Sequence, residues 1–138
     1  MNIWNLITEG NFEEAVKAVD DQSKTEENLF NLRNKLYALF HLNRYQDCVT
    51  LSLIIIDRDN GQVDSDFIFL GIAYWALGEY QNAISSWASG EQSLYTDAAG
   101  GVELQLLLLF AAIKTGDIKG GKVIRRKLEK LVPKKKKT

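Results

Sequence analysis

The side chains that most often carry out chemistry are scarce in this sequence. Among its 138 residues there is one histidine, His41, and one cysteine, Cys48. A Cys and a His on one helix face could form a nucleophile pair, but a turn at Asn43 is expected between these two. The spacings that hold zinc, HExxH and CxxC, do not occur. The sequence therefore predicts neither an enzyme nor a metal site.

One segment, Gly116 to Lys122, matches the pattern GxxxxGK of a loop that binds nucleotide phosphates. In that loop a Ser or Thr follows the lysine and holds magnesium, whereas Val123 stands at this position here. The loop should also follow a buried strand, but the residues before Gly116 predict a helix. We therefore interpret the segment as a turn between helices, and we predict no cofactor.

A short pattern recurs four times and predicts the elements that would position functional side chains. Each copy has a turn-forming residue, a large apolar residue two positions later and a small residue three positions after that. The copies are Gly10/Phe12/Ala15, Asn43/Tyr45/Cys48, Gly78/Tyr80/Ala83 and Gly116/Ile118/Gly121. Gly and Asn tolerate the left-handed conformation that ends a helix, and a small residue lets two helices approach closely. The pattern predicts four helical hairpins, or about eight helices, with Cys48 in the core.

The aliphatic segment from Val49 to Ile56 leaves a strand open as an alternative. It is rich in β-branched residues and continuous enough to resemble a buried strand. It directly follows Tyr45-Gln-Asp-Cys48, however, and this position favours the second helix of a hairpin.

The third copy belongs to a longer motif of large and small residues at fixed spacing. This motif reads Phe67-x2-Leu70-Gly71-x2-Tyr74, followed by Gly78, Tyr80, Ala83 and Trp87. It resembles a tetratricopeptide repeat, and the four large anchors are 33, 35 and 38 residues apart, close to the ~34-residue period of that family. The resemblance implies an all-α, right-handed solenoid of about four helical hairpins that binds proteins. We expect it to span residues 1–132, followed by a basic tail at residues 133–138.

In stacked hairpins the first helices of the pairs form the inner wall of a curved groove. Aligning the copies places four residues at equivalent inner positions: Trp4, Tyr37, Ile72 and Phe110. Six more lie one turn away: Arg33, Phe40, His41, Ile68, Trp75 and Leu106. Aromatic residues and Arg dominate binding energies at interfaces, so the predicted partner-binding residues are Trp4, Arg33, Tyr37, Phe40, His41 and Trp75. For the aliphatic residues the alternative is a place in the core.

Charge is distributed unevenly along the chain. Residues 114–138 hold eleven Lys or Arg and two acids, whereas residues 1–113 hold six Lys or Arg and sixteen acids. A run of lysines is usually a solvated tail, and we interpret the tail in this way. Nucleic-acid contact, a nuclear address and contact with a partner protein are the alternatives for this basic end.

A second resemblance covers roughly residues 64–115. It rests on Trp87-Ala-Ser-Gly90, on Tyr95 to Gly101 and on the aliphatic run that ends at Phe110-Ala-Ala112. These segments resemble small bacterial helical-repeat proteins that are encoded beside polymorphic toxins and act as immunity proteins. The resemblance implies one protein partner, a bacterial toxin whose basic cleft the acidic body would block. The alternative is an adaptor or chaperone-type module that holds an extended peptide in its groove.

The sequence also gives an expectation for the cellular compartment. The amino terminus lacks a basic region followed by an apolar run, so no targeting segment is expected. The longest apolar run, from Leu104 to Ile113, is interrupted by Gln105 and is shorter than the ~20 residues that cross a bilayer. A single cysteine provides no internal disulfide and fits a reducing compartment. We therefore expect a cytoplasmic protein without membrane contact.

Overall fold

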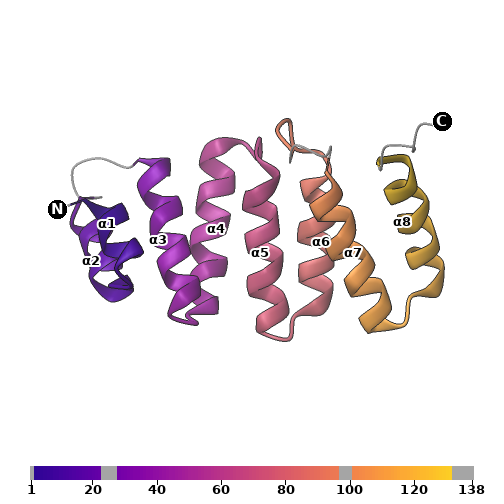
Figure 1. Cartoon of the computed structure of the whole chain (residues 1–138), viewed down its shortest axis with the longest axis horizontal. Helices are drawn as coiled ribbons and strands as arrows, with labels where there is room; N and C mark the ends of the chain where they lie inside the picture. The colour runs from indigo at the N-terminus through magenta and orange to yellow at the C-terminus, as the bar shows by residue number, and fades with distance from the viewer. Residues whose placement is uncertain (1, 23–27, 97–100, 132–138) are drawn as a thin grey trace, which may run out of the picture.

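The computed structural model describes residues 2–22, 28–96 and 101–131 of the chain. Over these residues the protein is all-α. Its eight helices are α1 (Ile3–Thr8), α2 (Phe12–Gln22), α3 (Leu29–His41), α4 (Tyr45–Asp59), α5 (Asp64–Ala76), α6 (Tyr80–Gly90), α7 (Val102–Thr115) and α8 (Ile118–Leu131). Each helix packs on its neighbours in the sequence, and the four hairpins stack in chain order into an elongated solenoid (Figure 1). The predicted fold class is confirmed.

The same turn closes all four hairpins. Its central residue has a positive φ between 57° and 80°, at Gly10, Asn43, Gly78 and Gly116. The next residue donates its N–H to the carbonyl five positions earlier, over 2.8 to 3.0 Å. This bond satisfies a carbonyl that would otherwise be unpaired at the end of the first helix. The second helices then begin at the four predicted anchors, Phe12, Tyr45, Tyr80 and Ile118.

The small residue of the pattern lies where the two helices of a hairpin meet. Ala15, Cys48 and Ala83 are fully buried, as the pattern predicts. Gly121 is the exception, because it remains half-buried between α7 and α8. The terminal hairpin is therefore packed less closely at this position than the other three.

The segment from Val49 to Ile56 lies within α4 and is helical. Its buried residues, with those just before it, are Cys48, Val49, Leu51, Ser52 and Ile55. Their spacing is that of one helix face rather than the alternation of a strand. The β-branched residues are accommodated because this face packs on α3 and α5. The helical interpretation is confirmed.

The third hairpin, which carries the fullest motif, has a close contact between its two helices. The Trp87 side chain is buried, and its Nε1 donates to the carbonyl oxygen of Ile68 over 3.2 Å. Its indole ring lies directly on Gly71 of α5, where an added Cβ would overlap the ring. The Leu-Gly of the motif is thus explained by the space that the indole occupies.

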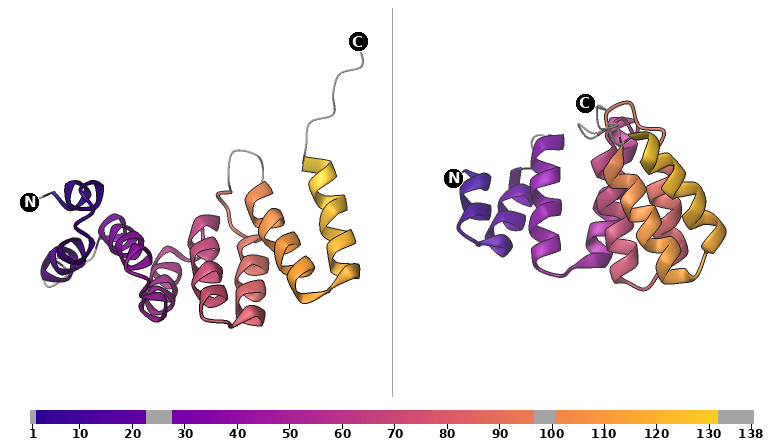
Figure 2. Two further views of the ribbon diagram at one scale, coloured as in Figure 1. Left: turned by 60° about the horizontal axis from the view of Figure 1, so that its bottom comes forward. Right: turned by 45° about the vertical axis from the view of Figure 1, so that its right-hand side comes forward.

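The stack is curved, because the helix axes rotate along it. A view that shows α1 and α2 nearly end on shows α7 and α8 from the side (Figure 2). The connector after α6 is tied to the one before α5 by two bonds, Asp64 N–H to the Tyr95 carbonyl (3.0 Å) and Tyr95 N–H to the Gln62 carbonyl (2.8 Å). Within the described ranges, no helix has the length and apolar character needed to span a bilayer.

Candidate functional site

A row of large apolar side chains runs along the inner surface of the stack. It contains one residue from each first helix, always six positions before the turn residue. The exposed fractions are 51% for Trp4, 42% for Tyr37, 37% for Ile72 and 41% for Phe110. We call these four residues the inner row. Because a contiguous set of exposed apolar side chains often marks an interaction site, the inner row is the candidate binding surface.

The direction of the inner row follows from the burial of its neighbours along the helix. Leu36 and Ala38 on either side of Tyr37 are buried, as are Gly71 and Ala73 on either side of Ile72. These flanking residues are buried against the rest of the stack, so the residue between them points away from it. Phe30, Leu106 and Ile113 are also exposed on the same first helices and enlarge the apolar surface.

His41 joins the inner row to α2. Its ring stacks on Phe12 with the centroids 4.4 Å apart, and it lies 4.5 Å from the ring of Tyr37. Cys48 is buried in the core whereas His41 is exposed, so His41 and Cys48 lie in different environments. The described residues also contain no group of three or more His, Cys, Asp or Glu that could hold a metal ion.

Trp75 packs against Phe110 of the inner row. Its ring contacts Tyr80 at 4.4 Å, Phe110 at 5.2 Å and Trp87 at 6.0 Å between centroids. The half-buried Trp75 therefore links α5, α6 and α7 and orients Phe110. The Nζ of Lys114 lies over the Phe110 ring, 5.8 Å from its centroid.

Arg33 is engaged within the protein. Its Nε and Nη2 donate to the two carboxylate oxygens of Asp66 over 3.0 and 2.7 Å, and Nη2 also lies 3.3 Å from Asp59. These contacts, led by the hydrogen bonds to Asp66, raise the pKa of Arg33. Asp66 is only 2% exposed, so the ion pair connects α3 to the buried side of α5. Arg33 is thus held by two carboxylates beside the inner row.

The sequence did not identify Asp66 as the partner of Arg33. Asp64 and Asp66 stand in the first turn of α5, where acids are common because they complement the helix dipole. Arg33 and Asp66 are 33 positions apart, whereas equivalent positions of these two repeats are 35 apart, as Tyr37 and Ile72 are. The equivalent of Arg33 in the next repeat is Ile68, so the repeat spacing gave no signal for the ion pair.

The remaining candidates divide between core and surface. Phe40 is half-buried and packs on the core, with its ring 5.4 Å from Phe69 and 6.1 Å from Tyr45. Ile68 is buried, which is the core alternative considered for the aliphatic residues. Leu106 and Ile72 are exposed on the inner surface.

The segment that matches GxxxxGK is a helical turn. Gly116 has a φ of 75° and ends α7, and Asp117 caps α8 by accepting the Gly120 N–H over 3.0 Å. The preceding element is the helix α7 rather than a strand. Tyr95, at the start of the loop from Tyr95 to Gly101, is exposed, and so is Leu94 just before it. Residues 97–100 of this loop lie outside the described residues.

The thiol of Cys48 should not react in the native protein. Burial raises its pKa to about 12, with a smaller contribution from the nearby Asp47. At pH 8 the native thiol should form roughly a thousandfold less thiolate than an unfolded one. Titration with a thiol reagent should therefore show slow modification in buffer and fast modification in urea. Equal rates in both would contradict the burial of this side chain.

Known proteins match this chain in structure but not in sequence. No family model and no curated protein sequence matches the chain. A solved structure of MamA, residues 41 to the end, from Desulfovibrio magneticus RS-1 superposes with a TM-score of 0.76 at 16% identity, covering 91% of this chain and 69% of MamA. An ArsTM double mutant of MamA RS-1 gives a TM-score of 0.77 at 16% identity, covering 91% and 68%. The chain therefore has the tetratricopeptide-like helical fold that MamA also has.

Proposed function

We propose that this protein is a binding module that holds one other protein against its inner surface, without catalysis. The observation that carries the proposal is the inner row, in which four successive hairpins each leave a large apolar side chain exposed at the same position. Full burial of a large apolar side chain contributes about 1.5–3 kcal/mol relative to full exposure, and these four are 37–51% exposed, so about half of that free energy remains to be gained at each. A partner that covers them would recover part of this free energy.

The chemistry of the inner surface favours an apolar contact. Arg33, the cation beside the inner row, is already paired with two carboxylates. The aromatic contacts of His41 and Trp75 hold Tyr37 and Phe110 in place. A preordered row of this kind suits an extended or helical segment that presents apolar side chains at regular intervals. Such a partner fits the adaptor alternative directly.

Substitution in the inner row tests the proposal. Peptides selected from a displayed random library on the wild-type protein should bind Tyr37→Ala and Ile72→Ala at least ~30-fold more weakly, since central contacts typically contribute ~2 kcal/mol or more. The matched control is Leu53→Ala on α4, which removes a slightly more exposed aliphatic side chain from a second helix. Circular dichroism should remain helical in all three. Peptides that bind the inner-row variants as tightly as the wild type would contradict the proposal.

More specifically, we propose that the bound partner is a bacterial toxin, which this protein neutralises by direct binding. The support for this form of the proposal is charge, because residues 1–113 carry ten more acids than Lys and Arg, and Glu13 and Glu14 are exposed on α2. An acidic surface speeds association with a basic cleft and is screened by salt. The proposal places the protein in the cytoplasm, where it would meet the toxin.

Co-expression with a neighbouring toxin gene tests this form separately. Wild-type protein should restore growth, and Tyr37→Ala should not, whereas Leu53→Ala should behave like wild type. Failure of the wild type to restore growth, together with peptide binding to the inner row, would favour the adaptor over the immunity protein. Restoration by every folded variant would move the toxin contact to another face.

A further inference from the structure

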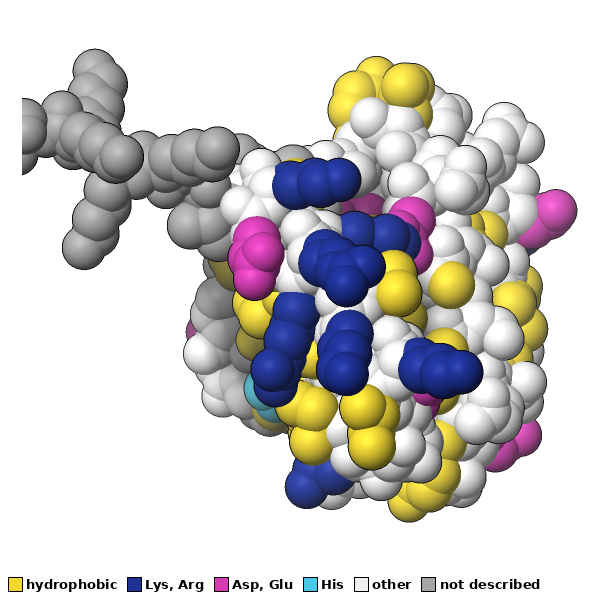
Figure 3. All heavy atoms as spheres, turned by 90° about the vertical axis from the view of Figure 1, so that its right-hand side faces the viewer, with side chains coloured by type: hydrophobic (Ala, Val, Ile, Leu, Met, Phe, Trp, Pro, Cys, Tyr) yellow, Lys and Arg dark blue, Asp and Glu magenta, His cyan; other side chains and the backbone are white. Residues whose placement is uncertain are grey.

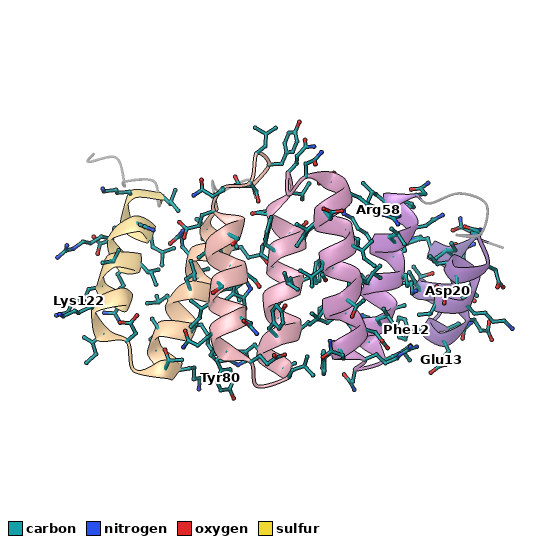
Figure 4. The ribbon with its side chains drawn as sticks, turned by 180° about the vertical axis from the view of Figure 1, so that it is seen from behind. Phe12, Glu13, Asp20, Arg58, Tyr80 and Lys122 are labelled. Carbon is teal, nitrogen blue, oxygen red and sulfur yellow. The ribbon has the colours of Figure 1, made fainter. Side chains whose placement is uncertain are left out.

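The two ends of the solenoid carry opposite charge. Residues 2–22, which form α1 and α2, contain five acids and one lysine. Residues 102–131, which form α7 and α8, contain seven Lys or Arg and three acids. Net charges of −4 and +4 are thus separated by two intervening hairpins. Glu13 and Asp20 lie at one end of the stack and Lys122 at the other (Figure 4).

Ion pairs with the middle of the stack do not remove this polarity. Asp20 pairs with Lys35 of α3 over 2.6 Å, and Lys127 pairs with Glu91 over 3.3 Å. Without Asp20 and Lys127, the net charge is −3 at the end formed by α1 and α2 and +3 at the end formed by α7 and α8. Within the described residues, the other exposed charges of α2 and α8 have no ion pair, so they are available to a partner.

The outer face of α8 is basic in a regular way. No residue of α8 is fully buried, and Ile124, Leu128 and Leu131 form its half-buried side. Lys122, Arg126 and Lys130 follow one another at intervals of four on the opposite side. Figure 3 shows the Lys and Arg side chains gathered over this end, with hydrophobic side chains between them.

Stability of the helix does not explain this arrangement. Lys130 in the last turn complements the helix dipole, but like charges four residues apart destabilise a helix, so the repulsion of Arg126 with Lys122 and with Lys130 opposes the folding of α8. A terminal repeat needs a polar outer face, but a mixture of charges would provide it without repulsion. An attractive contact with acids would offset the repulsion.

We propose that a second copy of this chain supplies those acids and docks the outer face of its α2 on the outer face of α8. In the described residues the outer faces of α2 and α8 are both exposed, so each copy offers one acidic face and one basic face. Glu14 and Asp21 are seven residues apart on the outer face of α2 and are both exposed. Over the described residues the two ends carry opposite net charges of −4 and +4, and this complementarity within one chain favours a second copy over an unrelated acidic partner. Such a head-to-tail contact is heterologous and adds further copies in a row.

Sedimentation of the full chain tests the contact. Because exposed ion pairs are weak and screened, the average mass should rise with protein concentration at about 0.02 M salt and return to that of a monomer at about 0.5 M. The double variants Glu14→Lys/Asp21→Lys and Lys122→Glu/Arg126→Glu bring residues 2–22 and residues 102–131, respectively, to a net charge of zero. Each variant alone should stay monomeric at low salt, while residues 133–138 are kept unchanged in all proteins.

Mixing the two double variants gives the decisive result. The acidic end of one still fits the basic end of the other, so an equimolar mixture should form a 1:1 dimer that does not grow. The control combines all four substitutions, which keeps the net charge of −1 but neutralises both ends, and it should be monomeric. Circular dichroism should show that every variant is folded.

Three outcomes would overturn the proposal. They are a wild-type protein that is monomeric at low salt, association that the double variants leave unchanged, and a mixture that fails to dimerise. A salt-sensitive complex of the wild type with a single-stranded oligonucleotide, lost in Lys122→Glu/Arg126→Glu without any self-association, would assign the basic end to a polyanion instead.

Discussion

Replacing Gly71 with Ala should destabilise the protein strongly, whereas the same replacement at Gly121 should stabilise it. Both glycines lie inside helices, α5 and α8, so the gain in helix propensity from Gly to Ala is similar, up to ~1 kcal/mol. At Gly71 the new methyl group would overlap the indole of Trp87, which is 1% exposed and hydrogen-bonded to Ile68. At Gly121 the nearest atoms, on Ala112 and Leu109, would be 3.9 Å away, an ordinary contact.

The two substitutions should therefore change the free energy of unfolding in opposite directions. Overpacking of a core typically costs ~1–3 kcal/mol and sometimes more, and we expect Gly71→Ala to lose ~3 kcal/mol net of propensity because a buried Trp ring must move. Gly121→Ala should gain about 0.5–1 kcal/mol, since it adds a contact and restricts the unfolded chain. Urea titration followed by circular dichroism measures both values.

A stable Gly71→Ala protein would contradict the close contact between α5 and α6. That contact also matters for the candidate site. Ile72 follows Gly71 directly, and Trp75 packs on Trp87, so displacement of the indole would change how the inner row is presented. Gly71→Ala should consequently lose peptide binding, while Gly121→Ala should retain it.

Replacing Arg33 with Met should cost ~3 kcal/mol of stability. The substitution keeps the aliphatic stem but leaves the carboxylate of Asp66, which is 2% exposed, without its cation. Breaking a buried ion pair from one side typically costs 3–5 kcal/mol, and we expect the lower end because the Arg33 side chain is 35% exposed to solvent. The free energy of unfolding in urea measures the loss.

The double variant Arg33→Met/Asp66→Leu separates charge from packing. With both charges removed, most of the lost stability should return, because apolar replacement of a buried ion pair is often neutral or stabilising. If Arg33→Met were as stable as the wild type and still lost peptide binding, Arg33 would contact the partner, as the sequence first suggested. Under the structural interpretation, its effect on binding should follow its effect on folding.

The helical hairpins were predictable from sequence because local rules govern them. A left-handed residue after an apolar run, an anchor two positions later and a small residue beyond it determine where one helix ends, where the next begins and where the two cross. The starts of α2, α4, α6 and α8 agree with these anchors. The equivalence of Trp4, Tyr37, Ile72 and Phe110 follows from the same period, and all four are exposed.

The contacts of the residues beside the inner row were decided only by the tertiary structure. Arg33, Phe40 and Trp75 have the residue types of binding hot spots, and sequence grouped them with Tyr37. Arg33 instead pairs with an acid one repeat away, Phe40 packs on Phe69, and Trp75 supports Phe110. Helical periodicity specifies the face of the helix on which a side chain lies. The contacts of that side chain depend on which long side chains from adjacent helices reach it. Those contacts depend on the spacing and curvature of the stack, which are set by interactions between repeats rather than within one.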